Sequence, residues 1–107
     1  MTGTIAIAIH GGAGANPKFD YTETQAHMTM LVEQAKGWLL GGMAALDAVE
    51  RAVAELEASG LYVAGRGAAP NRAGIHEFDA CIMDGAARKA GAVAFRFHTL
   101  LTGMVWR

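Results

Sequence analysis

The chain has 107 residues, enough for one small domain; 52% are hydrophobic and 18% are charged. Its formal net charge is −1, so composition gives no electrostatic support for binding to nucleic acid or to an anionic membrane surface. We see neither a signal peptide nor an apolar run near the roughly 20 residues of a membrane span. With Cys81 as the single cysteine, which fits a reducing compartment, we expect a cytoplasmic protein without nucleic-acid or membrane partners.

The chain opens on a stretch that is typical of a buried strand. From Thr4 to Ile9, isoleucine alternates with alanine, so both faces are apolar and we expect burial on both sides. The segment then runs into HGGAGAN, residues 10–16, with three glycines in five positions. Such glycines indicate a tight backbone path or the close approach of another group.

Two helices should follow. Asp20 or Thr22 can cap the first, which we expect to run to about Leu40 and to break at Gly41 and Gly42. Its apolar positions recur at helical spacing: Met28, Leu31, Ala35, Trp38 and Leu39. The second should run from about Ala44 to Ala58, with Gly60 just after it. Its expected apolar stripe is Leu46, Val49, Val53 and Leu56.

A hairpin should close the order of elements. Residues 60–74 hold four glycines and a proline and are predicted to form a loop. His76 to Asp84 reads as a strand with Phe78, Ala80 and Ile82 on one face, followed by a turn at Asp84-Gly85. A second strand from Lys89 to about Phe97 should pair with it. The fold class is therefore α+β.

The residues alone leave the chemistry open. HGGAG after a strand is compatible with a phosphate-binding loop or with an oxyanion loop of an α/β-hydrolase, but the companion motifs of both are absent from the sequence. A structural role for the glycines is favoured on spacing alone. The four histidines lack metal-ligand spacing, and Asp79 and Asp84, five apart on a strand, should face opposite ways.

Five motifs in order carry a resemblance to a known family. They are IAIHGGAG (7–14), ALDAVERAVAELE (45–57), AGRG (64–67), EFDACIMDG (77–85) and KAGAVA (89–94). In this order and spacing the chain resembles the N-terminal, α-subunit part of plant-type asparaginases and isoaspartyl peptidases, which are N-terminal-nucleophile hydrolases. The match covers residues 5–94. We therefore expect residues 1–94 to be an α-subunit-like part of such a domain. Residues 95–107 diverge from the family and indicate a frameshifted or truncated reading frame.

The resemblance implies a fold and a reaction. The family fold is an αββα sandwich, of which one strand, two helices and a hairpin would be present here, incomplete without the β subunit. Family precursors cut themselves, and the new N-terminal threonine of the β subunit attacks an asparagine side-chain amide or a β-aspartyl peptide bond. None of the threonines here stands in the family's G-T-V-G context: Thr2, Thr4, Thr22, Thr24, Thr29, Thr99 and Thr102. We expect no catalytic residue in this chain, no activity without a β subunit, and poor stability alone.

Two alternatives stay open beside an inactive fragment. The chain is compatible with the α part of a split enzyme, completed by a separately encoded β part. It is also compatible with a non-enzymatic domain on the same scaffold. The small-molecule amide or β-aspartyl dipeptide would bind only in a complete enzyme.

The resemblance also assigns site residues. The residues expected to line the active site are His10, Gly11, Gly12, Ala13, Gly14 and Val63. At Val63 the family usually has an asparagine whose amide helps to position the nucleophile, and valine lacks that group. No cofactor is expected for catalysis. A structural sodium ion would be bound by the main-chain carbonyls of Leu56, Glu57, Ser59, Tyr62, Ala64 and Arg66.

Overall fold

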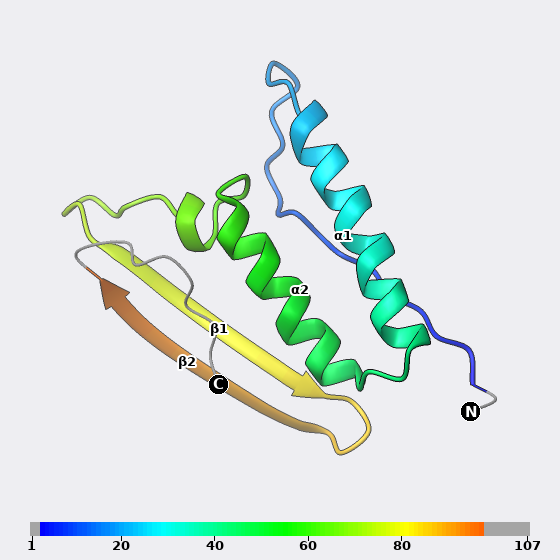
Figure 1. Cartoon of the computed structure of the whole chain (residues 1–107). Coiled ribbons are helices and arrows are strands. Elements are labelled where there is room, and N and C mark those ends of the chain that lie inside the picture. Colours follow the sequence, from blue (N-terminus) through cyan, green and yellow to red (C-terminus); the bar gives the residue numbers. More distant parts are fainter. Residues whose placement is uncertain (1–2, 98–107) are drawn as a thin grey trace.

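The computed structural model describes the backbone of residues 3–97 and the side chains of residues 3–94. Helix α2 lies between helix α1 and a β-hairpin, and the N-terminal segment runs alongside α1 (Figure 1). The elements in chain order are α1 (Thr22–Leu40), α2 (Ala45–Ser59), the short 3-10 helix η1 (Gly65–Gly67), β1 (His76–Asp84) and β2 (Lys89–Phe97). The predicted α+β class is confirmed. Within the described residues, no helix combines the length and the apolar character that a bilayer crossing requires.

Helix α1 begins and ends close to where the sequence predicts. The N-cap residue is Tyr21, which makes no side-chain cap hydrogen bond, so the prediction of Asp20 or Thr22 at that position is wrong. The Asp20 carboxylate instead accepts the Thr22 backbone N–H at 2.9 Å and the Thr22 hydroxyl at 2.6 Å. The hydrogen bond from the Thr22 hydroxyl and, to a smaller extent, that from its backbone N–H hold the pKa of Asp20 below its usual value. At the other end Gly42 takes a left-handed φ of 97°, which supplies the predicted break.

Helix α2 buries a different face from the one expected. The predicted stripe included Val49 and Val53, but these are 47% and 46% exposed. The buried residues are Ala48 and Ala52, at 1% and 5% exposure. Alanine allows close approach of α1, which contacts α2, and the stripe of larger side chains is left only partly covered.

The hairpin has the predicted strands and turn. β1 pairs antiparallel with β2 in a register that places Phe78 opposite Phe95 and Asp84 opposite Lys89. The Asp84 carboxylate accepts the backbone N–H groups of Ala86 and Ala87 at 3.0 and 3.5 Å, an arrangement typical of aspartate at a turn. Of the expected inner face, Phe78 and Ala80 are half-buried, whereas Ile82 is 39% exposed.

The prediction of a strand from Thr4 to Ile9 is wrong for this structure. Within residues 3–97 the sheet consists of β1 and β2, so this extended segment has no hydrogen-bonded neighbouring strand. Its isoleucines at 5, 7 and 9 are half-buried, while Ala6 and Ala8 are exposed. Burial on both faces is therefore also wrong, because only one side of the segment has a neighbour. The alternation predicted an extended backbone but not its pairing.

The hydrophobic core is small for a chain of this size. Among the described residues, the buried ones are Leu31, Ala35, Ala48, Ala52 and Tyr62. Three of these five are alanines, and Leu31 is the largest side chain that is fully buried. Little apolar surface is thus removed from water among these residues, which supports the expectation of low stability.

Candidate functional site

The HGGAG loop, residues 10–14, is an exposed turn whose shape depends on glycine. The Gly12 backbone N–H donates to His10 Nδ1 at 3.1 Å. Gly12 and Gly14 have φ values of 112° and 84°, in the region that favours glycine over any residue with a Cβ. Ala13 lies between them and is also exposed. The loop therefore presents main chain, with little side-chain cover, to whatever lies beside it.

Gly11 fixes where this loop meets the rest of the molecule. A Cβ at Gly11 would lie 2.8 Å from Met28 Cε on α1 and 3.2 Å from Tyr62 Cε1 in the loop after α2. A side chain at this position would displace the flexible end of Met28 and press against the Tyr62 ring, so glycine allows the closest approach. The predicted close approach is confirmed, and the groups that approach are two side chains of this chain.

The segment Leu56–Arg66 folds back on the end of α2. The Ser59 hydroxyl donates to the Leu56 carbonyl at 2.8 Å and accepts the Leu61 backbone N–H at 3.2 Å. Arg66 Nη1 donates to the Ala58 carbonyl at 3.1 Å, and Gly60 has the left-handed φ of 73° expected after the helix. These contacts close the turn that the sequence marks only by its glycines.

Two glycines of η1 pack directly against main-chain carbonyls. A Cβ at Gly65 would meet Glu57, with the Glu57 carbonyl oxygen at 2.7 Å. A Cβ at Gly67 would collide with the Tyr62 carbonyl oxygen and would lie 3.0 Å from that of Gly60. The carbonyls of Glu57 and Tyr62, both in the predicted ligand set, therefore face the inside of the turn. Burial at this point raises the pKa of the Glu57 carboxyl.

Tyr62 brings the two predicted site segments together. Its side chain is 8% exposed, packs against Gly11, and is hydrogen-bonded through its hydroxyl to His27 Nδ1 at 2.9 Å. The next residue, Val63, is 81% exposed. The expected lining residues His10–Gly14 and Val63 are thus linked by one intervening aromatic ring.

The linking side chains were not predicted from the sequence. His27 read as an ordinary histidine and Met28 as helix packing, while Tyr62 was expected only to offer its carbonyl. His27 and Tyr62 are 35 positions apart, so no local spacing marks them as partners. The only sequence signal is Gly11 itself, which indicates close approach without naming the partner.

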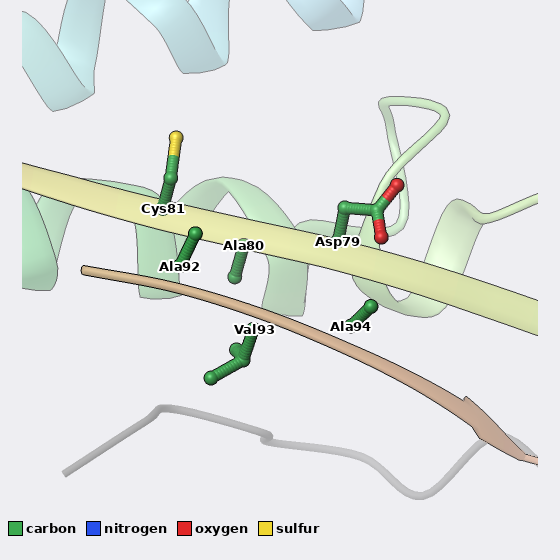
Figure 2. A pocket seen from close by; sticks show the side chains of 6 residues that line it. All are labelled: Asp79, Ala80, Cys81, Ala92, Val93 and Ala94. Carbon is green, nitrogen blue, oxygen red and sulfur yellow. The ribbon is translucent and has the colours of Figure 1, made fainter.

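The hairpin carries a shallow trough that contains none of the predicted site residues. It has a volume of about 420 Å³, and Figure 2 shows its lining side chains, from both strands: Asp79, Ala80, Cys81, Ala92, Val93 and Ala94. Most of these side chains are small, and Cys81 is an exposed free thiol. Within the described part of the chain, no three His, Cys, Asp or Glu side chains are grouped to hold a metal ion.

Comparisons with known proteins place the chain in a family. The model of the asparaginase family matches residues 3–97. The chain is 47% identical over 97 residues to the isoaspartyl peptidase of Salmonella typhimurium and 44% identical over 101 residues to that of Escherichia coli. It is 40% identical over 90 residues to the human isoaspartyl peptidase/L-asparaginase.

The alignments cover most of this chain but less than a third of each relative. These alignments cover 86%, 90% and 82% of this chain, but 31%, 32% and 29% of the respective relatives. The chain thus spans about a third of the length of the curated relatives it matches. Because the family model matches residues 3–97, most of the 107-residue chain, the chain belongs to the asparaginase family.

Proposed function

We propose that this chain forms the α-subunit part of a hydrolase that cleaves the side-chain amide of asparagine or a β-aspartyl peptide bond. The contact between Gly11 and Tyr62 carries the proposal. It holds the HGGAG loop beside the loop that carries Val63, and these are the two segments that the family resemblance assigns to the active site. Relatives named isoaspartyl peptidase and isoaspartyl peptidase/L-asparaginase support the reaction class.

In the proposed site this chain supplies main chain rather than the nucleophile. A threonine of a β part would attack the amide carbonyl, with its own free amine as base. The exposed glycines of residues 10–14 would let backbone lie close to the reacting amide without a Cβ in the way. His10 already accepts the Gly12 N–H, so we assign it to shaping this loop and not to proton transfer.

A structural sodium ion is the second part of the proposal. The carbonyl oxygens of Glu57 and Tyr62 face inward against Gly65 and Gly67, and hard main-chain oxygens suit such a cation. The Leu56 carbonyl accepts the Ser59 hydroxyl and that of Ala64 accepts the Gly67 N–H. Each retains a second lone pair. These four carbonyls support the proposed set of Leu56, Glu57, Ser59, Tyr62, Ala64 and Arg66, which would hold the ion and stiffen the loop.

We further propose that a β part of the same family is the partner of this chain. Val49 and Val53 on α2, and Ile82 and Val93 on the hairpin, are 39% to 47% exposed. Covering such side chains contributes about 25 cal/mol per Å² of apolar surface. Without that partner we expect no hydrolysis, because no threonine of this sequence stands in the family's nucleophile context.

The test is complementation. The 107-residue chain is co-expressed with all of the Salmonella relative that follows the matched region, and aspartate release is measured from asparagine and from a β-aspartyl dipeptide. We expect activity from the pair and none from either part alone. A pair that co-purifies but stays inactive on both substrates would contradict the proposal.

Val63→Asn sharpens this test. Restoring an amide beside the nucleophile should raise kcat/KM of the pair, since one positioning hydrogen bond in a transition state is worth up to about 10²-fold. Val63→Leu is the matched control, because it changes the side chain without adding a hydrogen-bonding group. Equal gains from both variants would remove Val63 from the site.

A further inference from the structure

The side chain of Tyr62 is held from two directions inside the α part. On one side its ring approaches Gly11, with Cε1 3.2 Å and Cδ1 3.4 Å from where a Cβ would be. On the other side its hydroxyl is hydrogen-bonded to His27 Nδ1 at 2.9 Å, and the two rings lie 5.7 Å apart at 50°. Three segments far apart in sequence therefore meet at one phenol ring.

The hydrogen bond determines the direction in which that ring points. Burial raises the pKa of the Tyr62 phenol, which keeps it protonated at neutral pH. A phenol removed from water needs a hydrogen-bond partner, and His27 supplies one from the second turn of α1. Leu31, one turn further on, is fully buried and packs α1 against the rest of the molecule close to this point.

The HGGAG loop depends on this ring for its place. Within residues 3–97 the segment that precedes it has no strand partner, so ladder hydrogen bonds do not hold it. The close contacts at Gly11 are those to Met28 and Tyr62. Met28 is flexible and can adjust, whereas the Tyr62 side chain has fewer rotatable bonds and its hydroxyl is held by His27.

We propose that His27 and Tyr62 are positioning residues: their hydrogen bond sets the spacing between the HGGAG loop and Val63. The expected effect on catalysis rests on the proposed function, whereas the effect on the position of the HGGAG loop rests on this chain alone. Neither residue touches the substrate in the proposal. They act through Gly11, and Tyr62 acts also through its peptide bond to Val63.

The first experiment uses NMR on the full 107-residue chain. Tyr62→Phe removes the hydroxyl and keeps the ring. We expect the Gly11 α-proton signals, displaced by the nearby ring, to move toward random-coil positions, and the His27 imidazole nitrogens to change their tautomer signature. Thr29→Ala is the control: its exposed hydroxyl donates to the Gln25 carbonyl at 2.9 Å within α1 and touches neither loop, so both signals should stay.

His27 provides a second, independent pair of variants. His27→Asn keeps a hydrogen-bonding group near the position of Nδ1, and His27→Leu removes it. We expect Leu to reproduce the effect of Tyr62→Phe on Gly11 and Asn to restore most of the parent signal. Should Tyr62→Phe lose helical structure by circular dichroism, this pair decides the question. Gly11 and His27 signals that do not respond to any of these variants would overturn the proposal.

The catalytic consequence is read in the complemented pair. Tyr62→Phe and His27→Leu should lower kcat by up to about 10²-fold, the cost of a misplaced group, and should change KM less. An equal fall in the Thr29→Ala control would overturn the positioning role. If the parent pair is itself inactive, the proposed function fails, while the NMR result still decides the geometry.

Discussion

The two halves of the molecule reach very different degrees of packing. The helical half, α1 and α2 with the loop that follows, contains every buried hydrophobic residue among those described, from Leu31 to Tyr62. The hairpin half has none: its side chains up to residue 94 are half-buried or exposed. Helices satisfy their backbone hydrogen bonds internally, whereas a two-stranded sheet is marginal without further strands or a covering layer. The difference teaches that the helical half carries its own core and that the hairpin requires a partner.

The strongest way to break this comparison is to truncate one large apolar side chain in each half. Leu31→Ala empties a fully buried site and should lower the free energy of unfolding by about 2–5 kcal/mol. Met83→Ala, at a site that is 61% exposed on β1, should change it by no more than about 0.5 kcal/mol. Urea titrations followed by circular dichroism compare the two. Similar losses would show that the hairpin is as well packed as the helices.

The loop after α2 should be packed as tightly as the helices it follows. Gly67→Ala places a methyl group against the Tyr62 carbonyl and should cost about 1–3 kcal/mol through overpacking. Gly85→Ala in the hairpin turn is the control, because nothing lies within 4 Å of its added Cβ. Thermal melts of both variants measure the difference. A Gly67 variant as stable as the Gly85 variant would show that the loop is not packed on α2.

A smaller effect is expected where the two helices meet at their surface. The Arg51 guanidinium on α2 lies 4.3 Å from the centroid of the Trp38 ring on α1. Arg51→Gln should therefore cost about 0.5–1 kcal/mol, while Arg72→Gln, at an exposed loop position, should be neutral. The readout is the melting temperature at low and high salt. Equal shifts in melting temperature for both variants would show that the Arg51–Trp38 contact does not stabilise the helical half.

The smallest expected effect concerns pH. Burial raises the pKa of Glu57 in the folded chain, so the folded state binds a proton more readily than the unfolded state and stability falls as pH rises through the folded pKa. The window begins above the unfolded value of about 4.3. Glu57→Gln should flatten this decline, and Glu55→Gln, exposed on the same helix, should leave it unchanged. Urea midpoints across that range test it, and a decline unaltered by Glu57→Gln would contradict it.

Local signals predicted the elements, and tertiary neighbours decided what the sequence missed. Gly41-Gly42, Gly60 and Asp84 mark ends and turns through their own backbone chemistry, and the structure confirms each. Which face of α2 is buried depends on α1, so the alanines beside the predicted stripe are buried in place of the stripe itself. Thr4–Ile9 has the composition of a strand, but pairing is a property of two segments and not of one.

The candidate site shows the same division. The glycines at 11 and 67 indicate close approach, and the structure places side chains beside Gly11 and carbonyl groups beside Gly67. Their partners lie too far away in sequence for any periodicity to reveal them. The roles assigned to the HGGAG loop, to Val63 and to the sodium-binding carbonyls rest on family resemblance and stay predictions.

The spacing of the His27–Tyr62 hydrogen bond along the chain has a consequence for the order of folding events. The hairpin closes over a four-residue turn and can form locally in about 1–10 μs. The phenol–imidazole contact joins residues 35 positions apart and must wait until both helices have formed and docked, because distant contacts carry a larger loop-closure entropy. We therefore expect this contact to form late in folding and to open early in unfolding, releasing the glycine loop while the helices are still intact.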